Sequence, residues 1–255
     1  MDATRPGPIV EPGPELTDAD RFRYARNISI PAIGELGQRR LRNARVLSVG
    51  AGGLGSPALL YLAAAGVGVL GIVDDDEVTG HNLQRQVLHD EASVGTPKVA
   101  SAAARLTGLD SGVRVETHEL RLDADSALEI FADYDVILDC TDNFAARYVI
   151  NDACVALGKP EVWAAVLRTD AQVSTFWPAR GWPQLRDLFP TEPDVVTHAD
   201  VLGQGVLGAM TGQVGAMMAT EAIKLIVGAG EPLLGRLLYL DALGSRLTEI
   251  PLRTR

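Results

Sequence analysis

The sequence predicts an α/β protein with a doubly wound, mostly parallel sheet, and three observations support this. First, short apolar strand-like segments alternate with Ala- and Leu-rich helical stretches. Second, a glycine run, Gly50 to Gly55, stands between the first strand and the first helix of that series. Third, three carboxylates, Asp74 to Asp76, follow the second strand directly. This combination is typical of a Rossmann-like, nucleotide-binding sheet.

The alternation indicates the individual elements. Strands are expected at 45–50, 69–73, 113–119, 135–139 and 161–165, and helices at 56–65, 97–107, 124–133 and 144–157. A short charged helix is expected near Asp18 to Asn27, before the sheet. Beyond Asp170 we expect a strand over 172–177, a long helix over about 205–227 and a hairpin over 236–252, which would form a C-terminal antiparallel extension.

The same pattern predicts the domain organisation. Residues 1–17 are proline-rich with little apolar content, so we expect a disordered leader. Residues 18–255 would form one domain, and its segment at about 178–204, rich in Pro, Trp and Asp, would be a crossover loop.

Composition narrows the class of protein. The formal charge of −10 over 255 residues argues against nucleic acid as a partner. No basic stretch followed by an apolar one stands near the N-terminus, and the two cysteines, Cys140 and Cys154, form no CxxC pair, so we expect a cytoplasmic protein with buried free thiols. Residues 201–220 lack charge, but five glycines and two glutamines favour a core helix over a membrane span.

The glycine run and the carboxylates predict a nucleotide site. Glycines let the backbone turn tightly and approach a ligand, and the following helix offers free N–H groups to phosphate. Asp74 stands where such folds hold ribose hydroxyls; for Asp75 and Asp76, simple solvation of the strand end is the open alternative. The predicted nucleotide-binding set is Gly50, Gly52, Gly53, Gly55, Asp74, Asp76, Asn82, Arg85 and Lys98.

Further polar residues exceed what a dinucleotide needs. Asn82 and Arg85 are three residues apart, so on a helical turn they would project together toward β- and γ-phosphate oxygens. Lys98 opens a helix after Pro97 and could reach the α-phosphate. Asp142 follows a strand end at the same crevice and could coordinate Mg²⁺; its neighbour Asp139 could assist, or could be a buried acid bonded to backbone N–H groups.

The chain resembles the MoeB/ThiF family of adenylyltransferases, which are relatives of the ubiquitin-activating enzymes. The motifs that carry the resemblance span residues 21 to 250 in the family's order and spacing. They are Arg23-Tyr24-Ala25-Arg26, Gly50-Ala51-Gly52-Gly53-Leu54-Gly55, Asp74-Asp75-Asp76, Asn82-Leu83-Gln84-Arg85-Gln86, Gly95-Thr96-Pro97-Lys98, Asp139-Cys140-Thr141-Asp142-Asn143 and Glu221-Ala222-Ile223-Lys224.

The resemblance implies a reaction and a set of roles. The C-terminal Gly-Gly carboxylate of a ubiquitin-like sulfur carrier protein would attack the α-phosphate of ATP, giving acyl-AMP and pyrophosphate. Asp142 would bind Mg²⁺, and Arg85 and Lys98 would act on the phosphates. Arg26 would reach the γ-phosphate of the other subunit's ATP, so the protein would be a homodimer with Arg26 acting in trans.

The sequence departs from the family at its zinc ligands. Most members hold zinc with two CxxC pairs, but here the first stretch reads Gln184-Leu185-Arg186-Asp187-Leu188-Phe189-Pro190 and no cysteine follows Cys154. We therefore expect no zinc, and a loop packed through Trp177, Trp182, Leu185 and Phe189. The family's loop cysteine and its C-terminal sulfurtransferase domain are also missing from this sequence, so the reaction should stop at the adenylate.

Other functions stay open at this point. A related enzyme could adenylate a peptide C-terminus or a carboxylated tRNA nucleoside, although the acidic charge disfavours tRNA. An NAD(P)-binding oxidoreductase would explain the glycine run and Asp74 but would leave Asn82, Arg85, Lys98 and Asp142 without a role. A non-catalytic scaffold would leave this whole polar set without a role.

Overall fold

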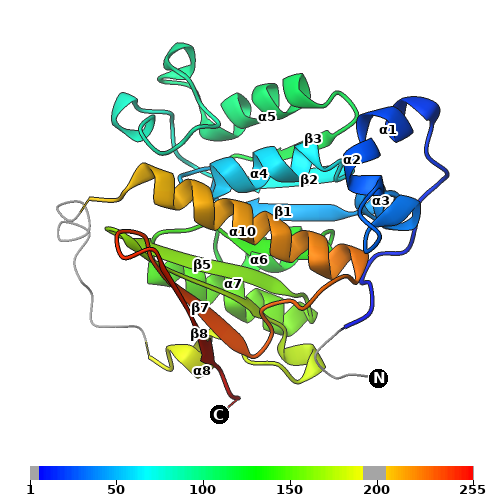
Figure 1. The fold of residues 1–255 in the computed structure, drawn as a ribbon. Helices are drawn as coiled ribbons and strands as arrows, with labels where there is room; N and C mark the ends of the chain where they lie inside the picture. The colour runs from blue at the N-terminus through cyan, green and yellow to red at the C-terminus, as the bar shows by residue number, and fades with distance from the viewer. Residues whose placement is uncertain (1–5, 192–204, 255) are drawn as a thin grey trace.

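A single eight-stranded sheet organises the chain. The structure is a computed structural model, which describes residues 6–191 and 205–254. The strand order is β3-β2-β1-β4-β5-β6-β7-β8 (Figure 1). The strands are β1 Arg45–Val49, β2 Val69–Val73, β3 Arg114–His118, β4 Val136–Asp139, β5 Glu161–Leu167, β6 Asp170–Phe176, β7 Arg236–Asp241 and β8 Arg246–Pro251.

The sheet has a parallel half and an antiparallel half. Strands β3, β2, β1, β4 and β5 pair in parallel, with Val49 opposite both Val73 and Asp139. From β5 to β8 every pairing is antiparallel. The predicted Rossmann-like sheet with an antiparallel C-terminal extension is therefore confirmed.

Helices cover both faces of the sheet and also precede it. In Figure 1, α3, α4, α5 and α10 lie on one face, and α6 and α7 on the other. The helices are α1 Asp18–Arg23, α2 Ala25–Ile28, α3 Gly34–Asn43, α4 Gly55–Ala64, α5 Lys98–Leu109, α6 Ala124–Phe131, α7 Phe144–Leu157, α8 Leu185–Leu188 and α10 Gly208–Val227, with short 3₁₀ turns at Gly80–Asn82, Glu91–Ser93 and Pro178–Arg180. No helix in the described part of the chain is long and apolar enough to cross a membrane.

Local sequence fixes the ends of the helices that flank the site. The Asn143 side chain accepts the Ala146 N–H and so caps α7 one residue after Asp142. At its other end α7 stops at Gly158, whose φ of 67° is left-handed. Helix α10 stops in the same way at Gly228. These caps set where each helix ends.

Three sequence-based expectations need correction or extension. Residues 6–17 are ordered rather than disordered, because Val10 and Leu16 are buried and the Ile9 N–H donates to the Leu225 carbonyl; residues 1–5 lie outside the described residues. Helix α3, which buries Leu41, was not predicted. The predicted crossover loop at 178–204 contains α8, and its residues 192–204 are not described.

Candidate nucleotide-binding and adenylation site

The predicted site residues other than Arg26 lie at or beyond the carboxyl ends of β1, β2 and β4. The chain leaves β1 toward β2 on one side, whereas β4 pairs with β1 on the other side. This reversal of strand order is where open α/β sheets bind ligands. The glycine loop follows β1, Asp74 follows β2, and Asp142 lies just beyond β4.

Two of the loop glycines are required by the protein itself. Gly50 has a φ of 103°, and a Cβ there would lie 2.9 Å from the Cys140 carbonyl oxygen. A Cβ at Gly55 would lie 2.1 Å from the Gly50 carbonyl oxygen. Gly52 is different, since the first atom that its Cβ would meet is Gln86 Nε2 at 3.5 Å. The space beside Gly52 is therefore open for close approach by a ligand.

The loop presents unsatisfied hydrogen-bond donors. Leu54, the residue before α4, provides no side-chain cap. The N–H groups of Gly52, Gly53, Leu54 and Gly55 donate to no acceptor among residues 6–191 and 205–254. Free N–H groups at a helix N-terminus bind anionic oxygens, as a phosphate group would provide.

Asp74, Asp76 and Lys98 form one charged cluster beside this loop. Asp74 accepts the Ala51 N–H at 2.8 Å through Oδ2 and the Asp76 N–H at 2.9 Å through Oδ1. Lys98 Nζ lies 2.6 Å from Asp76 Oδ2 and 3.9 Å from Asp74 Oδ1. Burial raises the pKa of Asp74, and the nearby Lys98 charge opposes that rise. Asp74 thus braces the loop and keeps free lone pairs for a ribose hydroxyl.

The predicted proximity of Asn82 and Arg85 is confirmed. Arg85 Nη2 donates to Asn82 Oδ1 at 3.2 Å, from a 3₁₀ turn that ends at Asn82. Asn82 is buried and Arg85 is half-buried. A Cβ on Gly53 would lie 3.5 Å from Arg85 Cγ, so the guanidinium arm runs beside the glycine loop. A fork of N–H donors here suits phosphate oxygens.

Asp139 and Asp142 have different environments. Asp139 is fully buried and accepts both the Thr141 N–H at 2.9 Å and the Thr141 hydroxyl at 2.6 Å. Burial raises the pKa of Asp139, and the charge of Arg147 opposes that rise. Of the two roles expected for Asp139, magnesium ligand or buried structural acid, its burial and its bonds to Thr141 favour the structural one. Asp142 is exposed and forms no ion pair within the described residues; its one weak contact is with Asn143 Nδ2 at 3.5 Å.

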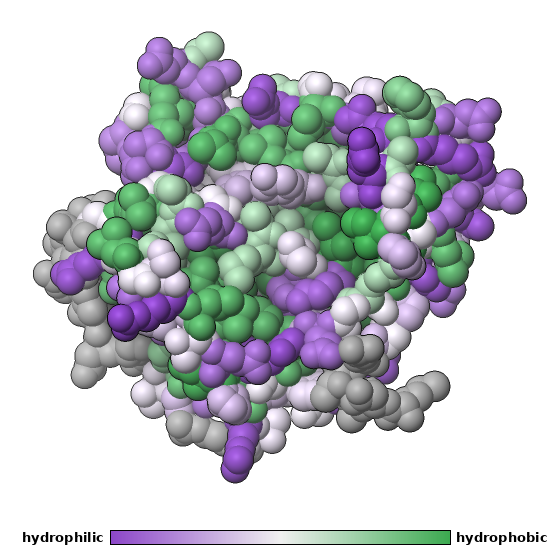
Figure 2. Space-filling view, viewed as in Figure 1, coloured by the Kyte–Doolittle hydropathy of each residue, from purple (hydrophilic) through white to green (hydrophobic). Residues whose placement is uncertain are grey.

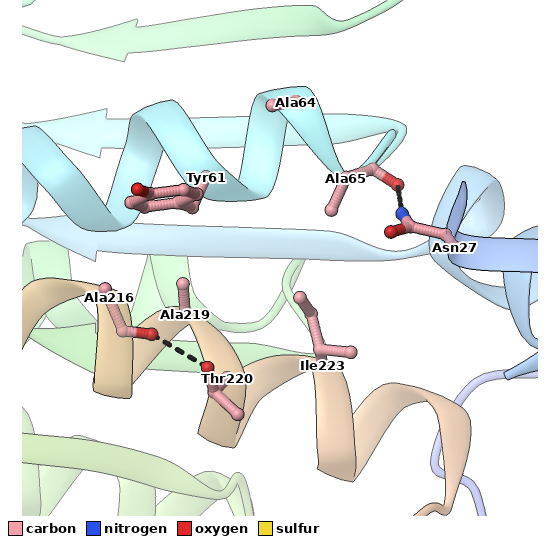
Figure 3. A pocket seen from close by; sticks show the side chains of 8 residues that line it. All are labelled: Asn27, Tyr61, Ala64, Ala65, Ala216, Ala219, Thr220 and Ile223. Atoms are coloured by element: carbon pink, nitrogen blue, oxygen red, sulfur yellow. Dashed lines mark hydrogen bonds between the residues drawn. The ribbon is translucent and has the colours of Figure 1, made fainter. Parts of the chain in front are cut away.

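The structure does not bring Arg26 to the rest of the set. Its neighbour Asn27 donates to the Ala65 carbonyl at 3.4 Å, at the C-terminal end of α4 (Figure 3). The glycine loop lies at the other end of this ten-residue helix, about 15 Å away at 1.5 Å per residue. Arg26 is exposed, with no hydrogen bond or ion pair to the described residues.

Two buried side chains at the site were not predicted as site residues. His89 is buried, and its Nε2 lies 2.9 Å from the Ala51 carbonyl oxygen. Gln86 is also buried, beside Gly52, and its Oε1 has no partner among the described residues. Gln86 belongs to the Asn82–Gln86 motif. The only sequence signal for His89 is its position four residues after Arg85.

Both cysteines are buried free thiols, as expected. Burial raises the pKa of Cys140 to about 12 and that of Cys154 well above its usual range. Because a thiolate is the reactive form, neither residue is a nucleophile at neutral pH.

Polar groups occupy the positions where the family's first zinc-ligand pair would stand. The Gln184 N–H donates to Asp187 Oδ2 at 2.9 Å, which closes a capping box at the start of α8. Asn151 on α7 joins this network, accepting the Leu185 N–H at 2.9 Å and donating to Gln184 Oε1 at 3.2 Å. Below it, Leu185 and Phe189 pack with Trp163. Trp177 and Trp182 pack with the main core, so the expected aromatic and aliphatic packing is confirmed.

The sequence profile of the ThiF family matches residues 24–255. The chain belongs to the ThiF family. Curated relatives agree with this assignment. This chain is 50% identical over 249 residues to the probable adenylyltransferase/sulfurtransferase MoeZ of Mycobacterium tuberculosis. The match covers 96% of this chain and 64% of MoeZ.

Two further ThiF relatives come from distant organisms. The SAMP-activating enzyme E1 of Haloferax volcanii is 47% identical over 232 residues, with 91% of this chain and 85% of that protein covered. The maize adenylyltransferase and sulfurtransferase MOCS3-2 is 47% identical over 232 residues, with 91% and 48% covered. The chain thus spans 64% of MoeZ and about half of the maize protein.

Solved structures share the fold of this chain. E. coli MccB in a crystal structure with MccA-N7isoASN superposes with a TM-score of 0.80 at 23% identity, over 91% of this chain and 73% of MccB. PaaA superposes with a TM-score of 0.79 at 22% identity, over 94% and 76%. At these identities the likeness concerns the fold alone.

Proposed function

We propose that this protein adenylates the C-terminal Gly-Gly carboxylate of a ubiquitin-like sulfur carrier protein, using ATP and giving acyl-AMP and pyrophosphate ahead of thiocarboxylate formation. One observation carries the proposal: the N–H groups of residues 52–55 are free, Arg85 runs beside Gly53, and Lys98 lies near Asp74, which binds the same loop. Asp142 follows β4, the strand next to β1. A dinucleotide needs fewer cationic groups. The names of MoeZ and of the SAMP-activating enzyme E1 support the same activity.

The chemistry is a displacement at the α-phosphorus. A carboxylate oxygen of the carrier forms a bond to that phosphorus while the bond to the bridging oxygen of pyrophosphate breaks. Lys98 and Arg85 offset the charge on the phosphoryl oxygens, Asn82 holds the guanidinium, and Asp74 and Asp76 hold the ribose side. No side chain forms a covalent bond to substrate, so catalysis rests on placement and charge.

The donor set fits a magnesium ion at Asp142. Mg²⁺ in nucleotide sites takes one or two carboxylates and completes its shell with phosphate oxygens and water. Asp142 is an exposed carboxylate that forms no ion pair with the described residues, although it interacts electrostatically with Arg147. When bound, the ion would neutralise charge on the transferring and leaving phosphates. Gln184 and Asp187 stand where the first zinc-ligand pair would be expected, and they are hydrogen-bonded to other groups, so we propose ATP and Mg²⁺ without zinc.

The position of Arg26 supports a homodimer in which Arg26 acts in trans. Arg26 lies at the C-terminal end of α4 and the glycine loop at its N-terminal end. A twofold axis across the middle of α4 would exchange these two ends, so that each Arg26 meets the partner's loop. Guanidinium would then grip the γ-phosphate bidentately.

A groove lies on this face beside the C-terminal half of α4, next to Asn27. It has a volume of about 310 Å³ and runs between α4 and α10, with Tyr61, Ala64, Ala216 and Ile223 among its lining residues (Figure 3). Tyr61 is 59% exposed there. Figure 2 shows hydrophobic residues gathered around α10 on this face. A second copy would cover them.

Exposed leucines mark a surface for the carrier. They stand near the carboxyl edge of the sheet, where the carrier's tail must enter: Leu167, Leu207, Leu243 and Leu247. The Leu207 N–H donates to the Arg168 carbonyl at 2.9 Å, and the Ala242 N–H donates to the Thr169 carbonyl at 3.0 Å. These bonds join the β5–β6 turn to the start of α10 and to the β7–β8 turn. We assign this edge to a protein partner, and propose a cytoplasmic reaction without membrane or nucleic acid, in keeping with two free thiols and a net charge of −10.

Isotope exchange between pyrophosphate and ATP tests the proposal. Exchange should require a carrier ending in Gly-Gly and should stop when that carboxylate is converted to an amide. A Leu243→Glu variant should need more carrier for half-maximal exchange at an unchanged KM for ATP. Exchange with a peptide or tRNA substrate alone would favour the related adenylating functions. Binding of NAD(P) with no exchange under any condition would favour the oxidoreductase.

A further inference from the structure

One buried histidine, His89, contacts the glycine loop at a single backbone atom. His89 Nε2 lies 2.9 Å from the Ala51 carbonyl oxygen, and Nδ1 lies 2.9 Å from Ser101 Oγ. The His89 side chain lies among buried residues, with 7% of the residue exposed. Both ring nitrogens therefore have a protein partner, and the ring is held in one orientation.

The two partners define the proton positions on the ring. A carbonyl oxygen only accepts, so Nε2 must carry the hydrogen that points to Ala51. In the neutral ring Nδ1 then accepts, and the Ser101 hydroxyl donates to it. Burial lowers the pKa of His89, with the Ala51 contact opposing and the Lys98 charge adding to the effect, which agrees with a neutral ring.

This contact sets the direction of the next N–H group. In a planar trans peptide the carbonyl and the N–H point in opposite directions. Because the Ala51 carbonyl points at His89, the Gly52 N–H points away from His89, and it has no acceptor among the described residues. The Ala51 N–H is held at 2.8 Å by Asp74. Both peptide units around Ala51 are thus fixed before any ligand arrives.

His89 also links the three segments that carry the phosphate-binding groups. It follows Arg85 by four residues, and its N–H donates to the Gln86 carbonyl at 3.1 Å. Ser101 lies one turn after Lys98 on α5. The ring therefore connects the glycine loop, the Asn82–Arg85 turn and the helix that bears Lys98.

We propose that His89 is a positioning residue for ATP: its neutral imidazole, oriented by Ser101, fixes the Ala51 carbonyl so that the free N–H groups of the glycine loop stay turned toward the phosphates. The proposal rests on ATP binding at this loop, as proposed above. Any buried imidazole needs a partner for each ring nitrogen; what singles out His89 is that one partner is the Ala51 carbonyl in the glycine loop and the other is a serine on the helix that bears Lys98.

Paired substitutions at position 89 test this role. Glutamine carries an N–H donor far enough out to replace Nε2–H, whereas asparagine is too short. His89→Asn should raise the Kd for ATP about tenfold, the size of one buried hydrogen bond, and His89→Gln should raise it less than about threefold. Affinity for the carrier should not change in either variant. Amide exchange of Ala51, whose N–H is held by Asp74, should quicken in His89→Asn and return toward normal in His89→Gln.

Two controls keep the outcomes separate. His118→Asn removes a half-buried histidine that contacts Tyr134 and should leave the Kd for ATP unchanged. Arg85→Ala must weaken ATP binding if the site itself is assigned correctly. If Arg85→Ala weakens binding while His89→Asn does not, the role of His89 is wrong and the proposed function stands. If neither variant affects ATP binding, the nucleotide site is wrong.

A variant that does not fold leaves a second route. Should His89→Asn be unstable, Ser101→Ala keeps the ring and removes its orienting hydroxyl. Nitrogen-15 NMR should show the Nε2–H tautomer of His89 in the wild type, and a mixture of tautomers with weaker ATP binding in Ser101→Ala. An Nδ1–H tautomer in the wild type, or full ATP affinity in Ser101→Ala with mixed tautomers, would overturn the proposal.

Discussion

Asn27 Nδ2 donates to the carbonyl oxygen of Ala65, which fixes α2 against the C-terminal end of α4. Gln38 Nε2 binds the same carbonyl at 2.8 Å, so the junction is braced from α3 as well. Arg26, one residue before Asn27, is thereby held a full helix length from the glycine loop of its own chain.

This separation predicts complementation between two inactive variants. Arg26→Ala and Asp142→Ala chains should each lose activity alone. In a mixed dimer one site lacks both groups and the other has both, so about half of the wild-type activity per dimer should return. Mixed dimers isolated with two different affinity tags provide the measurement. Mixed dimers that stay inactive would show that Arg26 works in cis or has no role.

Asp142→Ala should lower the rate of adenylation at least about a hundredfold, the size of one strong electrostatic contact in a transition state. The melting temperature should hardly change, because the Asp142 side chain is exposed and its one hydrogen bond is long, at 3.5 Å. Asp125→Ala, an exposed acid in the first turn of α6, is the matched control and should retain full activity. Pyrophosphate exchange near the wild-type rate in Asp142→Ala would remove Asp142 from the site.

Replacement of Cys140 and Cys154 by Ala should leave adenylation largely intact. Both thiols are buried, and burial raises the pKa of Cys140 to about 12 and that of Cys154 well above its usual range, so both should be protonated and unreactive near neutral pH. Loss of two small buried side chains should cost about 1–2 kcal/mol in the free energy of unfolding. In native wild-type protein at pH 8, iodoacetamide should label neither thiol. A folded double variant that binds ATP but forms no adenylate would show that a thiol takes part.

The purified protein should contain no stoichiometric zinc, and chelators should not lower its melting temperature. Instead, the hydrogen bonds among Asn151, Gln184 and Asp187 should stabilise this segment. Asn151→Ala should therefore lower the free energy of unfolding by about 1–3 kcal/mol, because it leaves the Leu185 N–H and Gln184 Oε1 without their partner. Elemental mass spectrometry measures the zinc content, and thermal unfolding measures the stability of the wild type with chelator and of Asn151→Ala. One zinc ion per chain would require unexpected ligands.

Periodicity and turn residues predicted much of the fold because they act locally. The β2 strand at 69–73 and helix α7 at 144–157 match their expected bounds. In α7 these bounds coincide with the Asn143 cap and with Gly158. The ordered segment 6–17 was missed because its order depends on distant partners such as Leu225 and Arg39. Helix α3 was missed as well, and no simple start signal precedes it.

In the candidate site, too, local motifs predicted some features, whereas others depended on contacts between distant segments. Motif spacing indicated the neighbours Asn82 and Arg85, and Asp74 beside the glycine loop. The choice between two roles for Asp139 needed its burial and its bonds to Thr141. His89 could not be predicted, because its role depends on the meeting of the Ala51 carbonyl and Ser101 in three dimensions.

The most direct test is the fate of the α-phosphate. With ATP labelled at that phosphate and a carrier ending in Gly-Gly, wild-type protein should transfer label to the carrier, whose intact mass should rise by one adenylyl group. Unlabelled pyrophosphate should appear in equal amount, and Asp142→Ala should yield neither product. Hydrolysis of ATP to ADP with no mass change on any carboxylate-bearing carrier would contradict the proposed adenylation.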